Sequence, residues 1–277
     1  MNLKFDIAII GSGLTGKTAS IALAKAGYKI ALIDPTPFYK SNNSNKDTRT
    51  TALSKKAQLF YKKLNFWRLI EKNVCSINNI MVNDGNTDKS IFFEDSNNTL
   101  GFMIENRILS RSLEKAVLNE KNIVKFDTKL YNFNRSQKLV TIKLANSIII
   151  DCNLLIGADG KKSFVRKAAN IKYYEKNYNQ KAFIFNIKHE QDHHNIATEN
   201  FLEQGPLASL PIIKNRKNFC SSVVWSCNAP GYHRFMHCTK KEKEDILNLH
   251  LSKVLGKVKI ISSIKNWDLS LIKANKF

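Results

Sequence analysis

The sequence lacks several features that would assign it to a specialised class of protein. No uninterrupted apolar run in its 277 residues approaches the roughly 18 that cross a bilayer, so we expect no transmembrane helix. The N-terminal segment, Met1–Asp6, has no apolar stretch ahead of a small-residue cleavage site, and we expect no signal peptide. Only five cysteines are present, without a C-x-x-C pair, which favours reduced thiols over a disulfide framework.

Acidic residues are also scarce. The 44 Lys and Arg against 23 Asp and Glu give a formal net charge of +21. Such a charge suits a nucleic-acid or anionic-membrane surface. However, the lysines are spread along a chain that is also rich in Asn and Ile, which indicates compositional bias. We recognise no nucleic-acid-binding module and expect no nucleic-acid partner, whereas peripheral contact with a membrane is compatible with the charge.

The N-terminal segment has the pattern of a βαβ unit. Residues 5–10 form a short apolar run that predicts a buried strand, residues 14–26 have helical spacing, and residues 28–33 predict a second strand. Asp34 closes that second strand, at the position where an acid would accept hydrogen bonds from ribose hydroxyls. The unit therefore predicts a dinucleotide-binding domain.

The turn of this unit reads G-x-G-x-x-G, formed by Gly11, Gly13 and Gly16, with Leu14 at the start of the helix. In such turns the first glycine permits a tight bend and the second allows the backbone to approach a pyrophosphate. The third allows close packing of the helix, whose N-terminus attracts the anion.

The same residues allow a second interpretation. Gly11–Thr18 also reads G-x-x-x-x-G-K-T, the phosphate-binding loop of an NTPase, with Lys17 in register. Leu154–Asp159 would then be the apolar strand that ends in a magnesium-binding Asp. An NTPase does not require an acid at position 34, and Gly160–Ser163 after Asp159 suits a pyrophosphate turn better than a magnesium site, so the residues favour the dinucleotide over the NTPase alternative.

A second motif resembles a zinc site. His189 and His193 form H-E-x-x-H, which binds zinc when both imidazoles lie one turn apart on a helix. The residues before His189 alternate in hydrophobicity with a period of two, which predicts a strand running into a polar loop. We therefore expect no metal site. We also find no nucleophile motif, and the catalytic residues are unknown at this stage.

The rest of the chain predicts a mixture of helices and strands. The segment 180–227 alternates as a β-rich region would, without repeats or low-complexity linkers. The other expected elements are helices at 54–64, 108–120 and 240–255, and strands at 122–126, 128–133, 138–144, 147–150, 153–157 and 258–265, with short strands between 76 and 100.

Four segments together resemble the FAD-dependent aromatic hydroxylases of ubiquinone biosynthesis, in the p-hydroxybenzoate-hydroxylase fold group. The first is the glycine motif with Asp34, and the second is Arg49–Ser54, similar to the family's R-x-x-A-L-S. The third, Leu154–Arg166, is similar to G-A-D-G-x-x-S-x-V-R. The fourth is a series of Y-x-Q, H-x-x-A-x-E-x-F and G-P-L-A-x-L-P, found here at residues 178–180, 194–201 and 205–211.

The resemblance implies an α/β fold with a Rossmann-like FAD-binding βαβ domain and a second, β-sheet-rich substrate domain. We place the FAD-binding domain at 1–75 and 101–178, and the substrate domain at 76–100 and 179–277. The residues expected to contact FAD are Gly11, Gly13, Leu14, Gly16, Asp34, Arg49, Asp159 and Gly160. Lys17 would then be incidental, and the NTPase remains the alternative.

The implied activity is monooxygenation of a polyprenyl phenol, using NAD(P)H and O₂, through a flavin C4a-hydroperoxide. The implied partners are this phenol and other proteins of ubiquinone biosynthesis, and the implied location is the cytoplasm, with peripheral contact at the inner membrane.

The sequence departs from the family pattern at three places. Asp34 stands where Glu is usual, and Asn65 stands for Gly in a segment resembling L-G-x-W that ends at Trp67. The sequence given ends at Phe277, before the family's G-D-A-A-H-like motif, whose Asp lies by the flavin ribityl chain. We therefore expect a fragment or truncated product that binds FAD weakly and is catalytically incomplete.

Overall fold

A parallel sheet forms one end of the computed structural model, which describes residues 2–38, 47–85, 89–95, 99–213 and 219–276. Its strands lie in the order β13 (Leu154–Gly157), β2 (Ile7–Ile10), β3 (Ile30–Ile33) and β9 (Ile123–Phe126). The helix α1 (Leu14–Lys25) connects β2 to β3, which pair in parallel. The predicted βαβ unit is therefore confirmed.

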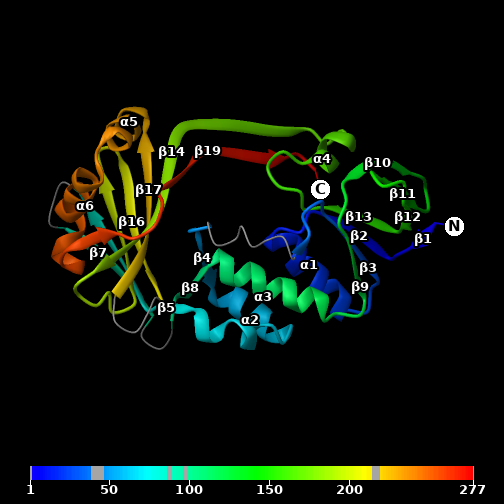
Figure 1. Ribbon diagram of the computed structural model, residues 1–277, viewed down its shortest axis with the longest axis horizontal. Coiled ribbons are helices and arrows are strands. Elements are labelled where there is room, and N and C mark those ends of the chain that lie inside the picture. The colour runs from blue at the N-terminus through cyan, green and yellow to red at the C-terminus, as the bar shows by residue number, and fades with distance from the viewer. Residues whose placement is uncertain (1, 39–46, 86–88, 96–98, 214–218, 277) are drawn as a thin grey trace.

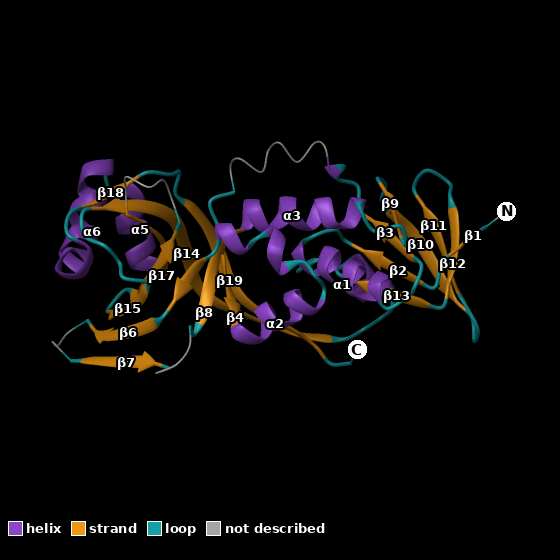
Figure 2. Ribbon diagram, turned by 90° about the horizontal axis from the view of Figure 1, so that it is seen from below, coloured by secondary structure: helices purple, strands orange, loops and turns teal. Residues whose placement is uncertain are grey.

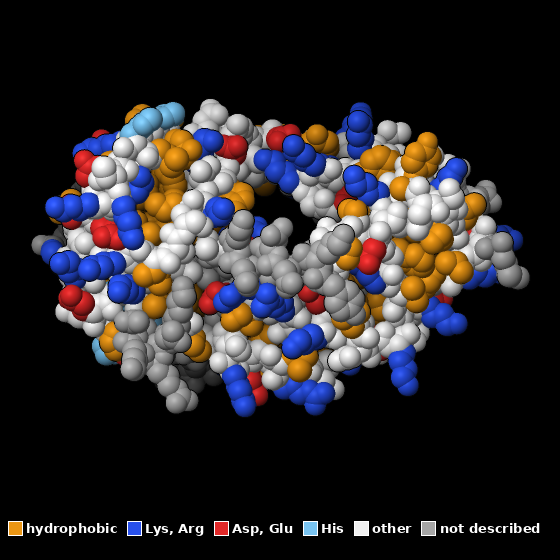
Figure 3. All heavy atoms as spheres, in the orientation of Figure 1, with side chains coloured by type: hydrophobic (Ala, Val, Ile, Leu, Met, Phe, Trp, Pro, Cys, Tyr) orange, Lys and Arg blue, Asp and Glu red, His pale blue; other side chains and the backbone are white. Residues whose placement is uncertain are grey.

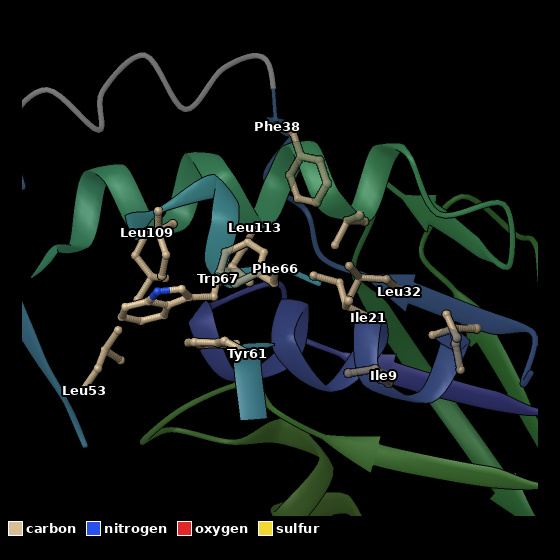
Figure 4. Packing of buried hydrophobic residues seen from close by; sticks show 14 of the residues in the cluster. Ile9, Ile21, Leu32, Phe38, Leu53, Tyr61, Phe66, Trp67, Leu109 and Leu113 are labelled. Atoms are coloured by element: carbon tan, nitrogen blue, oxygen red, sulfur yellow. The ribbon is translucent and has the colours of Figure 1, made fainter. Parts of the chain in front are cut away.

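Both faces of this sheet are covered. Side chains of Ile9 and Leu32 enter a core with α1, α2 (Lys55–Lys63) and α3 (Asn106–Leu118), which Figure 4 shows. Ala8 and Ala31 point to the other face. There the sheet packs on four strands in the order β1 (Leu3–Lys4), β12 (Ile149–Cys152), β11 (Val140–Leu144) and β10 (Leu130–Arg135). Two-sided burial explains why these strands are continuous apolar runs.

A largely antiparallel, eight-stranded sheet forms the other end of the molecule (Figure 1). Its order is β18 (Val258–Ile260), β14 (Tyr173–His189), β17 (Phe219–Asn228), β16 (Gly205–Ile212), β15 (Ile196–Leu202), β6 (Asn79–Asp84) and β7 (Ser90–Glu94), and β19 (Lys265–Ala274) also pairs with β14. Two helices, α5 (Ala229–His237) and α6 (Lys240–Leu255), cover one face through a core around Phe183 and Phe235.

A small sheet and a long ribbon lie between the two ends. The small sheet has the order β4 (Thr50–Ser54), β8 (Gly101–Glu105) and β5 (Cys75–Ile77), with 3-10 turns at Trp67–Leu69 and Glu71–Asn73 nearby. Figure 1 shows β14 and β19 running as a two-stranded ribbon from the eight-stranded sheet to α4 (Phe164–Ala168). Figure 3 shows a hollow between this ribbon and the helices of the parallel sheet.

The predicted β-rich segment and most of the expected helices and strands are confirmed, and the fold is the mixed α/β fold that was expected. The sequence did not predict α5 or β19.

The division into two domains stays a prediction, and two observations bear on it. The strands β6 and β7 join the second sheet by pairing with β15, and β14 crosses position 178 without a break but with a register shift between Asn177 and Gln180. Figure 2 shows the β6–β7 hairpin at the lower edge of the second sheet.

Within the described ranges, no helix is both long and apolar enough to cross a membrane.

Candidate dinucleotide-binding site

Three turns meet at the carboxyl ends of β2, β3 and β13. The Gly11 N–H donates to the Ile33 carbonyl at 2.8 Å, and the Ala158 N–H donates to the Ile10 carbonyl at 2.7 Å. The strand β2 lies between β3, which follows it, and β13, which comes from far along the chain. Such a switch point at the carboxyl ends of parallel strands is where open α/β sheets bind ligands.

The three glycines of the turn have different neighbours. Gly11 has a φ of +101°, and a Cβ on it would lie 2.4 Å from the Ala158 carbonyl oxygen. A Cβ on Gly16 would lie 1.9 Å from the carbonyl oxygen of Gly11. A Cβ on Gly13 would meet no atom within 4 Å. The fold itself therefore requires glycine at 11 and 16, whereas at Gly13 it leaves open space that a bound group can fill.

The helix α1 begins beside this open space. Gly13 is its N-cap residue, and no side chain caps the first turn or places an acidic group there. The first N–H groups of a helix have no partner within the helix, and the helix dipole makes this end electropositive. Leu14, the first helical residue, packs against the core. The turn therefore presents a surface that fits an anion such as a pyrophosphate.

Asp34 lies across the turn from these N–H groups. Its Oδ2 accepts from the Ser12 N–H at 2.8 Å, and its Oδ1 accepts from the Thr36 N–H at 2.8 Å. Partial burial alone would raise the pKa of this carboxyl, but these donors and the charge of Lys125 lower it below the ordinary value. Asp34 is therefore ionised near neutral pH, and each of its oxygens has a lone pair left to accept a hydroxyl.

Asp159 has both a structural contact and an orphaned atom. Its Oδ2 accepts from the backbone N–H groups of Phe164 at 2.7 Å and Val165 at 3.1 Å, at the start of α4. Its Oδ1 is buried without a hydrogen-bond partner. Gly160, which follows, has a φ of +82° and open space at its Cβ position. An orphaned buried acceptor calls for an explanation, and a bound hydroxyl-bearing ligand would provide one.

Arg49 has partners that the sequence did not indicate. Its Nη2 lies 2.8 Å from Oδ2 of Asp47, and its guanidinium lies over the Trp267 ring, 5.4 Å from the ring centroid. Hydrogen bonding to Asp47 raises the pKa of Arg49. Neither of these contacts reaches the glycine turn. The contact with Trp267 instead joins the segment before β4 to β19.

The match of Lys17 to a phosphate-binding loop is incidental, as expected, but Lys17 has a structural role that the sequence did not indicate. Its Nζ donates to Glu114 Oε1 at 2.7 Å and to Ser110 Oγ at 2.8 Å, in the interface between α1 and α3. Its side chain is only 5% exposed. Lys17 therefore points into the protein and away from the position a phosphate-binding lysine would occupy, so the NTPase alternative is not supported.

His189 is the last residue of a strand, as expected, and not part of a zinc-binding helix. Its Nδ1 lies 2.7 Å from the Gln191 carbonyl and its Nε2 lies 3.0 Å from the Ser221 Oγ. Burial lowers the pKa of its imidazole, so it is neutral near pH 7. These contacts already occupy both ring nitrogens within the protein.

The Y-x-Q segment lies at the irregularity in β14. Asn179 adopts a left-handed φ of +54° there, and Gln180 resumes pairing with β19. Gln180, Lys181 and Tyr232 line a pocket of about 370 Å³ beside Asp268. No role for Gln180 could be predicted from the sequence, because residues of β14, α5 and β19 come together to line the pocket only in the folded chain.

Comparison with known proteins gives a consistent picture. The family model described as "FAD binding domain" matches residues 4–268. "Ubiquinone hydroxylase UbiL" of Rhodospirillum rubrum is 27% identical over 98% of this chain and 63% of its own length. The "3-demethoxyubiquinol 3-hydroxylase" of Escherichia coli is 26% identical over 93% of this chain and 66% of its own length. The chain thus spans about two thirds or less of the curated relatives.

Solved structures share the fold. A mutant of PqsL from Pseudomonas aeruginosa has a TM-score of 0.75 at 14% identity, over 93% of this chain and 73% of that one. The p-nitrophenol 4-monooxygenase PnpA from Pseudomonas putida has a TM-score of 0.73 at 11% identity, over 99% of this chain and 70% of that one.

Proposed function

This chain belongs to the FAD binding domain family, and we propose that it forms the FAD-binding and substrate-facing part of a monooxygenase that hydroxylates a polyprenyl phenol in ubiquinone biosynthesis. The observation that supports this most directly is the convergence of the glycine turn, Asp34 and Asp159 around open space. The names of the ubiquinone hydroxylases that match nearly the whole chain support the substrate class.

Four residues would lie against the adenosine-pyrophosphate part of FAD. The N–H groups at the start of α1, next to Gly13, would bind the pyrophosphate, since no side chain caps the first turn and no acidic residue lies in it. The ionised Asp34 would accept from ribose hydroxyls. Asp159, whose buried Oδ1 has no partner, and Gly160, with open space at its Cβ position, would lie beside the same ligand. Gly11 and Gly16 would shape the turn without touching it.

Bound FAD would supply the redox chemistry, which is acceptance of hydride from NAD(P)H and activation of O₂. The residues of this chain would bind and orient the cofactor and the substrate, and would exclude water from them. Arg49 remains a proposed cofactor contact, held in place by Asp47 and Trp267. No residue of the chain is assigned to proton transfer.

Cofactor binding can be tested with one substitution in the open part of the turn. Gly13→Val should abolish FAD binding, because its side chain would enter the space that the pyrophosphate needs, while the thermal stability stays near that of the parent chain. Ala26→Val, at the exposed far end of the same helix, is the matched control and should bind FAD normally. Binding is measured by quenching of flavin fluorescence and by the shift in Tm with FAD or with Mg²⁺ and ATP.

The activity needs its own assay. The FAD-loaded protein is given NAD(P)H, ¹⁸O₂ and a polyprenyl phenol, and the product is examined for one added oxygen by mass spectrometry. A Tm increase with ATP but not with FAD would refute the cofactor assignment. FAD binding without labelled product, in a protein extended to the length of its relatives, would refute the hydroxylase assignment alone.

A further inference from the structure

The strand β7 has apolar side chains in solvent. It lies at the end of the eight-stranded sheet and, among the described residues, pairs with β6 alone. All five of its residues are exposed, including Ile91 at 62%, Phe92 at 59% and Phe93 at 53%. Proteins usually protect such an edge with charges, proline or a bulge, because its backbone is ready to pair with another strand. Here three large apolar residues occupy its centre.

The exposed side chains lie on both faces of the sheet. Successive residues of a strand point to opposite faces, so Ile91 and Phe93 share one face and Phe92 points to the other. A flat partner on either face would leave the other side uncovered. A strand added along the edge would place neighbours beside the side chains of both faces.

The backbone of β7 is oriented for such pairing. The Asp84 N–H donates to the Lys89 carbonyl at 3.2 Å, so 84 and 89 form a hydrogen-bonded pair of the β6–β7 ladder. Hydrogen-bonded pairs recur at every second residue of an antiparallel ladder, so Ile91 and Phe93 also bond to β6. The N–H and C=O groups of Ser90, Phe92 and Glu94 therefore point outward, to the open edge.

We propose that two copies of this chain associate through their β7 strands, which pair antiparallel about a two-fold axis at Phe92. Phe92 would face Phe92 of the second copy, and Ser90 would face its Glu94. Each of these is a pair of outward-pointing residues, and each would exchange two hydrogen bonds. On the two faces Ile91 would lie beside Phe93 of the second copy, an aliphatic–aromatic cross-strand pair. The proposal does not depend on the proposed enzymatic function.

The charges at the two ends of β7 favour a second copy over other partners. Lys89 precedes the strand, and Glu94 and Asp95 end and follow it. In antiparallel self-pairing centred on Phe92, Lys89 of each copy lies opposite Asp95 of the other. An isologous contact requires this kind of self-complementarity. An anionic membrane does not match a strand with two carboxylates at its end.

The first test removes one outward N–H. In sedimentation equilibrium over a concentration series, we expect a monomer–dimer equilibrium for the 31.6 kDa chain. Phe92→Pro should raise the dissociation constant at least about tenfold, since it removes a donor from each copy. The β6 ladder is spared, because Phe92 does not donate to it. Phe92→Val keeps the N–H and a strand-forming side chain and should retain most of the association.

The second test uses charge. Lys89→Glu and Asp95→Lys each place like charges opposite each other in a homodimer, so each variant alone should associate more weakly. An equimolar mixture of the two should restore dimers, since each end then joins opposite charges. Thermal melts of each variant check that the monomers fold.

Three results would overturn the proposal. They are a parent chain that stays monomeric at all concentrations, equal loss of association in Phe92→Pro and Phe92→Val, and no restoration in the mixed charge variants. A monomeric chain that sediments with phosphatidylcholine–phosphatidylglycerol vesicles, but not after Phe92→Lys, would assign β7 to a lipid surface instead.

Discussion

The two large sheets of the molecule use their strands in opposite ways. Every residue of β2 and β3 is buried, whereas every residue of β7 is exposed. The parallel sheet is covered on both faces, so its two central strands have no free side chains, and a ligand there must be met by the turns at their ends. The eight-stranded sheet has helices on one face and an open edge, so its side chains and backbone are available for contacts.

The largest expected effect comes from the closed interior of the first region. Lys17→Ala would leave Glu114 buried without its cationic partner and should lower the free energy of unfolding by about 3–5 kcal/mol. Urea denaturation followed by circular dichroism measures this. The contrasting pair, Lys181 with Asp268 on the ribbon, is exposed, and Lys181→Ala should leave the unfolding midpoint unchanged. Equal losses for the two variants would contradict the distinction between the regions.

A smaller effect separates two glycines of one turn. Gly16→Ala should cost about 1–3 kcal/mol, because its Cβ would overlap the carbonyl of Gly11 and force α1 away from β2. Gly13→Ala is the control and should change the stability by less than about 0.5 kcal/mol, since its Cβ meets nothing. The same denaturation experiment measures both. If Gly13→Ala were as destabilising as Gly16→Ala, the open space at Gly13 would not exist in solution.

The smallest effect is a pH dependence at Asp34. Because the folded protein lowers its pKa below the ordinary 3.8, ionised Asp34 stabilises the fold above that value. That contribution is lost as the pH falls below 3.8 and through the folded pKa. The difference in Tm between the parent chain and Asp34→Asn should therefore shrink as the pH falls from about 6 to about 3.

Asp268 supplies the comparison from the second region. Its pKa is also lowered, by Lys181, but its carboxylate is exposed to solvent. Asp268→Asn should therefore show a flatter pH dependence than Asp34→Asn. A difference in Tm that stays constant with pH for Asp34→Asn would show that the Ser12 and Thr36 hydrogen bonds do not distinguish the charged form.

Local sequence patterns predicted those parts of the fold and of the site that are formed by residues close together in the chain. The βαβ unit, the glycine turn and Asp34 lie within one short segment, and periodicity alone placed them. The partner of Lys17 is 97 positions away, and Trp267 lies still farther from Arg49, so no local pattern could indicate these contacts. Asn65 lies between these two cases, because the sequence marks the position but not its backbone conformation. Its φ of +53° is a left-handed angle that suits the glycine of the L-G-x-W pattern, but the angle itself is visible only in the structure.

The pairing of β2 with β13 also has a consequence for how the chain is made. Leu154 pairs with Ile7, so 154 − 7 = 147 positions separate the two strands. During synthesis the glycine motif leaves the ribosome long before the strand whose end packs against Gly11. Pairs so distant in sequence form late, because the chain between them must first lose its freedom. The nascent chain therefore contains the whole glycine motif well before Ala158 and Asp159, which pack against Gly11, have been synthesised.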